Sequence, residues 1–248
     1  MFTPKIFLPR PITSLLGIWA HPDDEAYLSA GLMAVVRQDG GRVMVATATH
    51  GELGTDDPGG CPPERLAPIR EGELHASLEA VDVREHVWLD HRDGELPQIP
   101  RDVGVAEILD LLHAVRPDTI VTFGADGMTG HPDHQAVSAW VAEAWRASGC
   151  LADLWFATLT PDFHRRWGGV NERVGLWFEG AVPPMTPPSQ LVAQICCTGE
   201  LLHRKQRALR AHSSQTRQLE AFVGPDVYRT WWATESFVAA PKVAAEHT

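Results

Sequence analysis

Short apolar runs alternate with helical stretches along the first two thirds of the chain, and this alternation limits the fold more than any other feature. We predict buried strands over residues 15–20, 42–49, 85–89, 118–123 and 154–159, and helices over residues 26–37, 64–81, 102–115 and 135–146. Strands that alternate with helices indicate a parallel sheet that carries helices on both faces. The predicted fold class is therefore α/β, with a Rossmann-like, doubly wound and mostly parallel sheet.

The last third of the chain is less periodic. We predict a loop over residues 161–169, strands over 174–178, 191–197 and 235–239, and a helix over 200–211. A length of 248 residues suits one α/β domain, and we find no internal repeat. We expect a single domain over residues 1–248, in which the C-terminal region caps the face of the sheet where the parallel strands end.

The stretch Trp19 to Glu25, W-A-H-P-D-D-E, places one imidazole and three carboxylates directly after the first predicted strand. In open α/β sheets, ligands bind outside the carboxyl ends of the strands. His21 and Asp24 are three residues apart and can converge on one point, whereas Asp23 points elsewhere. Acidic residues after a proline are also an ordinary helix start, so this stretch alone does not establish a site.

A second polar cluster, His131-Pro132-Asp133-His134, repeats this arrangement. It follows the predicted strand at 118–123 and precedes another predicted helix. Two unrelated helix starts would not need three histidines between them. The repetition therefore favours one shared site at the ends of two strands.

The side chains of the two clusters suit a catalytic metal site. Two histidines and one carboxylate, with an open position for water, fit catalytic zinc, and the same ligand types fit non-haem ferrous iron. His21, Asp24 and one histidine of the second cluster supply that set. Zinc lowers the pKa of its bound water to about 7, Asp23 can accept the water proton, and the remaining histidine can face the developing oxyanion. The combination predicts a metal-assisted amide hydrolase.

Composition excludes several partners. The net charge of −11 argues against nucleic acid or an anionic membrane as the main partner. No apolar run is long enough to span a membrane, and the N-terminal stretch lacks the apolar core of a signal peptide. The four cysteines form no C-x-x-C pair, which argues against a cysteine zinc site and fits a reducing compartment. We therefore expect a cytoplasmic protein with no nucleic-acid or membrane partner.

Three motifs resemble the LmbE-like, or PIG-L, family of zinc-dependent N-deacetylases: A-H-P-D-D-E at 20–25, G-H-P-D-H at 130–134 and K-x-x-A-L-x-A-H-x-S-Q at 205–215. The stretch His50-Gly51-Glu52-x-Gly54 and Arg70 also resemble that family, whose members remove acetyl groups from N-acetylglucosaminyl compounds. The resemblance implies one zinc per chain, with Fe²⁺ as a substitute, and a small N-acetylated amino sugar or glycoside as substrate. It leaves open whether the chain forms a homo-oligomer.

Residue by residue, the resemblance implies roles for both clusters. The implied zinc ligands are His21, Asp24 and His134. Asp23 would be the general base, and His131 would stabilise the oxyanion and protonate the leaving amine. Asp133 would hold the His131 ring, and a histidine near a carboxylate tends to stay protonated.

Arg70 and Glu52 resemble substrate-binding residues, and each has a structural alternative. Arg70 can form a helix-surface ion pair with Glu73, and Glu52 can close its own loop. His212 can approach the site from the C-terminal region or serve a structural role near a helix end, and we favour the structural role. We expect three further histidines to be loop residues: His50, His91 and His164.

Thr129 departs from the pattern of the mycothiol-type members, which carry a tyrosine two residues before the first histidine of the second cluster. An intermediate stabilised by that tyrosine hydroxyl would have to be handled differently here. The deacetylase chemistry itself does not depend on this position.

Two other classes of function use similar ligands. A non-haem Fe(II) oxygenase can use the same triad, but such sites usually lie in all-β barrels, whereas this chain alternates strands and helices. A non-catalytic, metal-dependent binding protein would not need Asp23 and His131. The sequence therefore favours the N-deacetylase.

Overall fold

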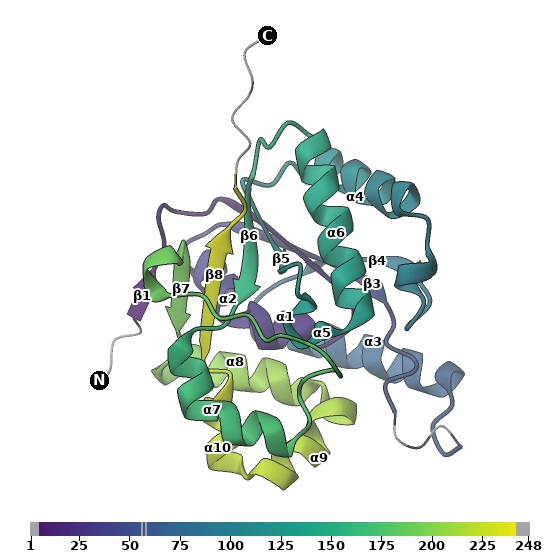
Figure 1. Cartoon of the computed structure of the whole chain (residues 1–248), viewed down its shortest axis with the longest axis vertical. Coiled ribbons are helices and arrows are strands. Elements are labelled where there is room, and N and C mark those ends of the chain that lie inside the picture. Colours follow the sequence, from purple (N-terminus) through teal and green to yellow (C-terminus); the bar gives the residue numbers. More distant parts are fainter. Residues whose placement is uncertain (1–4, 56, 58, 242–248) are drawn as a thin grey trace.

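One mixed sheet organises the protein (Figure 1). The computed structural model describes residues 5–55, 57 and 59–241, and in this part of the chain the strands lie in the order β1-β7-β8-β6-β5-β2-β3-β4. Five strands are mutually parallel: β2 (Ser14–Trp19), β3 (Arg42–Thr49), β4 (Glu85–His91), β5 (Thr119–Phe123) and β6 (Asp153–Thr158). Antiparallel pairings extend the sheet from β6 through β8 (Thr234–Ala239) and β7 (Ala193–Cys196) to β1 (Lys5–Phe7).

Helices cover both faces of the sheet. On one face α4 (Arg101–Val115) packs against α6 (Pro132–Ala147). On the other face α8 (Gly199–Ala211) packs against α2 (Ala30–Gln38) and α3 (Pro63–Ala80). This division follows from right-handed crossovers, because the chain moves one way along the sheet from β2 to β4 and the opposite way from β4 to β6. The α/β, doubly wound and mostly parallel fold is confirmed.

Short helices lie where the parallel strands end. They are α1 (Asp24–Leu28), α5 (Gly127–Gly130), α7 (Pro161–Arg173), α9 (Ser213–Val223) and α10 (Pro225–Trp231), with a single 3₁₀ turn at Leu96–Gln98. A second 3₁₀ turn, Pro188–Gln190, precedes β7. Figure 1 places α7, α9 and α10 beyond α1 and α5, at the carboxyl end of β5 and β6. The C-terminal region therefore caps this face, as the sequence predicts.

Two predictions for residues 161–178 are wrong. The predicted loop at 161–169 is the first part of α7, which begins after Thr160, whose hydroxyl accepts a hydrogen bond from the Phe163 amide. The predicted strand at 174–178 is irregular chain that follows the helix. Its apolar side chains Val174 and Leu176 still pack against the core, so burial without strand pairing explains their alternation.

The first predicted helix, at 26–37, is divided in two. Ser29 leaves the helical conformation between α1 and α2, and its hydroxyl donates to the carbonyl oxygen of Glu25. None of the helices in the described part of the chain has both the length and the apolar composition to cross a bilayer.

Candidate active site

The two polar clusters meet because β2 and β5 are neighbours in the sheet. His21 and Asp24 follow β2, and His134 lies in the first turn of α6 after β5. His21 Nδ1 lies 3.1 Å from His134 Nε2 and 3.7 Å from Asp24 Oδ2. His134 Nε2 lies 3.4 Å from Asp24 Oδ1. All three side chains are buried, so the expected ligands form one compact triad.

The triad has the spacing that a tetrahedral metal site needs. Ligands bonded to zinc at about 2.0–2.1 Å lie roughly 3.3 Å from one another, within the range of the three measured distances. His131 is an alternative third ligand, since its nitrogen lies within 4.8 Å of those of His21 and His134. The shorter distances favour Asp24.

Hydrogen bonds fix which ring nitrogen each histidine presents to the triad. His134 Nδ1 lies 3.0 Å from the Gly127 carbonyl oxygen and must donate to it, which leaves a lone pair on Nε2. His21 Nε2 lies 3.1 Å from Asp93 and 3.2 Å from Asp133, which directs Nδ1 toward the triad. Carboxylates and carbonyls behind metal-binding histidines commonly orient them in this way.

Asp133 acts on a different histidine from the one predicted. Its carboxylate lies beside His21 Nε2 and also accepts from the Gly94 amide at 2.8 Å, whereas only its own backbone N–H reaches His131, donating to Nδ1 at 3.1 Å. The reason is geometric, because His131 caps α6 and its Nδ1 faces the first turn of that helix. Asp133 supports His21 instead of His131.

Asp93 is a site residue that the sequence reading missed. The Asp93-Gly94 pair reads as a turn, yet the buried Asp93 carboxylate contacts His21 and accepts from the Leu53 amide at 2.9 Å. Glu52 Oε1 in turn accepts from the Asp93 amide at 3.0 Å. Of the two readings of Glu52, the structure therefore shows the closure of its loop, behind Asp93. The feature of the sequence that could have indicated Asp93 as a site residue is its position in the loop that follows a parallel strand, where functional residues are often found.

Asp23 lies beside the triad in a strained backbone conformation. Its φ of 116° is in the region that favours glycine, and non-glycine residues held there are concentrated at functional sites. Asp23 Oδ2 lies 3.3 Å from Arg70 Nη2, and its amide donates to Glu25 Oε2 at 2.9 Å. These contacts fix a carboxylate next to the triad but outside it.

Arg70 is buried and directed into the site, so the ion pair with Glu73 is not its role. Its guanidinium donates to the Gly51 carbonyl oxygen at 2.8 Å and to the Pro22 carbonyl oxygen, in addition to its contact with Asp23. A side chain on Gly51, which has a φ of 65°, would collide with this guanidinium. Glu73 instead accepts hydrogen bonds from Ser213 and Ser214 at the start of α9.

His212 has the structural role that the sequence favours. Its Nε2 lies 2.8 Å from Glu25 Oε1, and both side chains are fully buried. Burial disfavours both charges, but their attraction outweighs it, lowering the pKa of Glu25 and raising the pKa of His212. Glu25 links His212 to Asp23, since it pairs with His212 and also accepts the Asp23 amide.

Of the three histidines expected in loops, His50 is in one, whereas His91 ends β4 and His164 lies in α7. All three pair away from the triad: His50 with Glu71 and Asp90, His91 with Glu107, and His164 with the Pro184 carbonyl oxygen.

The buried carboxylates around His21 favour the binding of a cation. Burial opposes protonation of His21, but hydrogen bonds with Asp133 and Asp93 raise its pKa to about 10. Burial raises the pKa of Asp24 to about 7 against the opposing effect of His21. A divalent ion in the triad would supply the positive charge that a proton on His21 otherwise supplies.

His131 is neutral in this environment, contrary to prediction. Burial, and then the charge on His21, lower the pKa of His131 to about 4. The Asp133 carboxylate, which was expected to keep the ring charged, is turned toward His21. Because His131 Nδ1 accepts a backbone N–H, the neutral ring carries its proton on Nε2.

Known proteins share both the motifs and the fold. The family model described as "PIG-L: GlcNAc-PI de-N-acetylase" matches residues 16–145. A 1D-myo-inositol 2-acetamido-2-deoxy-alpha-D-glucopyranoside deacetylase from Kineococcus radiotolerans is 32% identical, with 84% of this chain and 71% of the relative covered. The corresponding deacetylase 1 from Saccharopolyspora erythraea is 28% identical, covering 94% of this chain and 88% of the relative.

A solved structure, that of N,N'-diacetylchitobiose deacetylase from Pyrococcus horikoshii, has a TM-score of 0.64 over 95% of this chain and 88% of its own, at 21% identity. This likeness shows a shared fold. The family match includes both polar clusters and the strands that carry them. The chain therefore belongs to the PIG-L, or LmbE-like, family.

Proposed function

We propose that this protein is a metal-dependent hydrolase that removes an N-acetyl group from an amino sugar or a glucosaminyl conjugate. The observation that carries the proposal is the convergence of His21, Asp24 and His134 beside the carboxylate of Asp23. The relatives described above are named deacetylases, and the named substrates contain 2-acetamido sugars. We further propose that residues 1–248 act as one domain, because the C-terminal elements complete both the sheet and the wall of the site.

His21, Asp24 and His134 would hold one zinc ion, or Fe²⁺ in its place. Two imidazoles and one carboxylate are the donor set of catalytic zinc sites, and their present spacing suits such an ion. When bound, the metal would polarise the amide carbonyl and lower the pKa of a water molecule at its open position.

The residues around the triad perform the proton transfers. Asp23 accepts the proton of the attacking water, and Arg70 holds its carboxylate in place. His131 donates a hydrogen bond from Nε2 to the oxyanion that forms on the carbonyl oxygen. Asp23, which then carries the water proton, and His131 are the two groups placed to protonate the leaving amine. Asp133 and Asp93 orient His21, and Glu52 holds the loop that carries Asp93. Arg70 positions the Asp23 carboxylate.

The two alternative functions have no support in the comparisons, which match named deacetylases over most of the chain. An acetate-release assay tests the proposal directly. Zinc-loaded protein is incubated with N-acetylglucosamine, its 1D-myo-inositol glycoside and N,N'-diacetylchitobiose, and acetate and free amine are measured. We expect equal amounts of both products from at least one substrate. Protein that binds zinc and releases no acetate from any of these amino sugars would overturn the proposal.

A further inference from the structure

A cavity of about 260 Å³ opens directly beside the triad. Asp23, Asp24 and His134 form one end of it. The remaining wall is largely apolar and is built by Leu28, Met128, Leu176, Leu219, Trp231 and Trp232. The volume equals that of roughly nine water molecules at about 30 Å³ each, far more than one acetyl methyl group occupies.

Three of the polar side chains in this wall, those of Gln215, Tyr27 and Trp231, have partners within the protein. The Gln215 amide donates to the Gly54 carbonyl oxygen at 2.9 Å, and the Tyr27 hydroxyl lies 3.4 Å from that of Tyr228. The Trp231 indole N–H donates to Asn171 at 2.8 Å, which turns its ring surface toward the cavity. Apart from these groups, Thr129 supplies one further polar side chain to the lining. Beyond the triad and Asp23, the cavity therefore offers few hydrogen bonds to the hydroxyl groups of a sugar.

The wall is closely packed on two sides. Trp232 packs edge-on against Tyr27, with ring centroids 5.6 Å apart, and contacts Phe163 at 5.1 Å. Met128 has a φ of 62° and is held by a hydrogen bond of 2.6 Å from its amide to Asp126. A preformed apolar cavity favours an apolar ligand without a cost of rearrangement.

We propose that this cavity receives the acyl group of the substrate and that the enzyme prefers N-acyl amino sugars whose acyl chain is longer than acetyl. This proposal rests on the proposed deacylase function. The scissile carbonyl carbon must lie next to Asp23, and the acyl chain is the substituent bonded directly to that carbon. Water adds to the carbonyl carbon, the C–N bond breaks, and the products are a fatty carboxylate and the free amine of a polar sugar.

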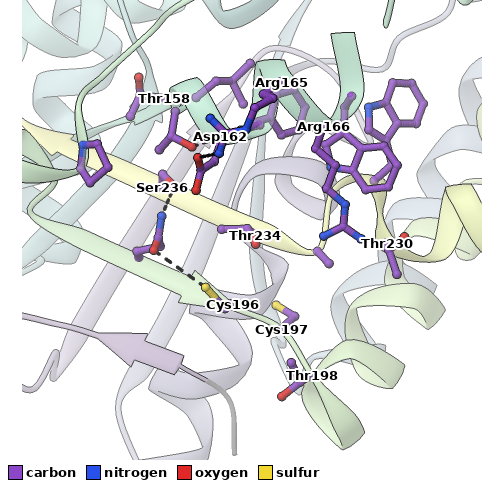
Figure 2. Close-up of a pocket in the computed structure, with 18 of the residues that line it drawn as sticks. Thr158, Asp162, Arg165, Arg166, Cys196, Cys197, Thr198, Thr230, Thr234 and Ser236 are labelled. Atoms are coloured by element: carbon purple, nitrogen blue, oxygen red, sulfur yellow. Dashed lines mark hydrogen bonds and ion pairs between the residues drawn. The ribbon is translucent and has the colours of Figure 1, made fainter. Parts of the chain in front are cut away.

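The cavity ends at Trp232, which limits the length of the chain. A separate space on the other side of Trp232 measures about 10 Å³, which is scarcely enough for one water molecule. A larger cavity of about 730 Å³ lies past this constriction, between α7, β7 and β8 (Figure 2). Figure 2 shows Thr158, Thr234 and Ser236 on the strands and Arg165 and Arg166 on α7. Its separation from the triad by the constriction keeps the larger cavity out of reach of the acyl chain.

A series of N-acyl glucosamines with acetyl, butyryl, hexanoyl and dodecanoyl groups tests the proposal with zinc-loaded enzyme. Each buried methylene favours binding about fourfold. We therefore expect kcat/KM to rise at least about tenfold from acetyl to hexanoyl and to fall for dodecanoyl, which the constriction excludes. In a parallel series of N-acetylglucosamine glycosides, a lengthened aglycone should give no comparable gain.

The variant Leu219→Trp fills the cavity from α9 and should lower the ratio of hexanoyl to acetyl turnover at least about tenfold. Leu176→Phe is a second filling variant for the case that Leu219→Trp does not fold. Leu151→Trp is the matched control, because Leu151 is 88% exposed and should leave the ratio unchanged. Calorimetric titration with acetate and hexanoate gives a readout that does not depend on turnover, and hexanoate should bind more tightly only when the cavity is open.

The outcomes separate the two proposals. Release of acetyl with no gain for hexanoyl, or a gain that survives both filling variants, overturns the acyl cavity. A gain in the glycoside series that the filling variants abolish assigns the cavity to the aglycone and also overturns it. If no substrate is cleaved, the proposed deacylase function is wrong. If hexanoate and acetate also bind equally, the proposal that the cavity binds an acyl chain is wrong as well.

Discussion

At the residue scale, Asp23 and Asp24 are neighbours in the sequence but face different partners. The Asp24 carboxylate lies within 3.7 Å of both histidine ligands, and it accepts the His21 amide at 2.8 Å. The Asp23 carboxylate lies beside Arg70. The triad is fixed by the pairing of β2 with β5, which brings its two motifs together, whereas Asp23 is fixed by a side chain from α3.

The variants Asp23→Asn and Asp24→Asn should therefore fail in different ways. Asp23→Asn keeps the three ligands, so it should retain zinc and lose about 10²–10⁴-fold in kcat, as expected for loss of a general base. Asp24→Asn removes an anionic ligand and should lose both zinc and activity. Elemental analysis and acetate release measure the two properties. A zinc-free Asp23→Asn, or an Asp24→Asn that is active with full zinc, would contradict these roles.

His86 makes stability depend on pH away from the site. Its Nε2 lies 3.0 Å from the Thr47 hydroxyl, and burial lowers the pKa of His86 to about 4. Between pH 4 and the ordinary pKa of about 6.5, the unfolded chain binds a proton that the folded chain does not. The free energy of unfolding should therefore rise as pH rises through this range.

The variant His86→Gln should remove about 1–2 kcal/mol of that rise, a value discounted for the partial exposure of the ring. Urea unfolding at pH 4.5 and 7, with chelator present throughout so that no metal contributes, measures the difference. The same substitution at His113, which is exposed on α4, is the control. An unchanged pH dependence in His86→Gln would contradict the assignment.

Sequence patterns could place the triad but not the groups behind it. His21, Asp24 and His134 follow from two motifs at the ends of neighbouring strands. The pairing of Asp93 and Asp133 with His21 depends on how three separate loops pack, and nothing local in the sequence records it. The same limit explains Arg70, whose spacing from Glu73 suits an ion pair although its actual partners lie in the loops after β2 and β3.

At the scale of elements, one buried ion pair joins four of them. Lys205 on α8 donates to Glu235 on β8 at 2.5 Å and to the Tyr27 carbonyl oxygen on α1 at 2.7 Å. Glu235 also accepts the amides of Gly31 and Leu32 at the start of α2, at 2.7 and 2.8 Å. The pair therefore fixes the divided first helix against the C-terminal elements.

Replacing Lys205 by Met should lower the free energy of unfolding by about 3–5 kcal/mol, because it leaves the Glu235 carboxylate buried and without its counter-ion. Adding Glu235→Gln should restore part of this loss, since the amide oxygen can still accept from Gly31 and Leu32. Urea denaturation of the single and double variants measures both effects. Arg229→Met, which breaks an exposed ion pair with Asp226, should change stability by less than about 0.5 kcal/mol.

Sequence patterns missed α7 although it is amphipathic, since Phe163, Trp167 and Val170 recur at helical spacing and pack against the core. The expectation of a loop follows from the charged side chains on its exposed face and from Gly168 and Gly169 within it. Its helical state depends on the Thr160 cap and on Phe163 and Asn171, which are buried against the C-terminal elements. The parallel strands could be predicted without knowledge of their neighbours, because strands that are buried on both faces have continuous apolar runs.

At the scale of the whole molecule, the last described strand, β8, is an interior strand of the sheet. β8 lies between β6 and β7, so the C-terminal end of the chain separates elements that precede it in sequence. The helices between β7 and β8 cap the site and supply Leu219, Trp231 and Trp232 to its cavity. Formation of the site therefore requires the fold of nearly the whole described chain.

This dependence predicts that metal binding stabilises the entire fold. The unfolded chain has no preformed triad, so an ion that binds the folded protein adds about 2.7 kcal/mol at a free concentration one hundred times its dissociation constant. For a domain of this size, that corresponds to a rise of roughly 5–10 °C in Tm. The buried carboxylates around His21 and His134 contribute to the effect, since the ion offsets their mutual repulsion.

Calorimetry of wild-type protein with zinc and with excess chelator measures this shift. Asp24→Asn is the control, because it lacks one of the three ligands and should show little or no shift with zinc at the same concentration. Asp23→Asn should shift as wild type does, because its change lies outside the triad. A wild-type Tm that is insensitive to chelation, or an equal shift in Asp24→Asn, would show that zinc binds elsewhere or not at all. We therefore expect zinc to raise the Tm of wild type and of Asp23→Asn by similar amounts, and to raise the Tm of Asp24→Asn much less.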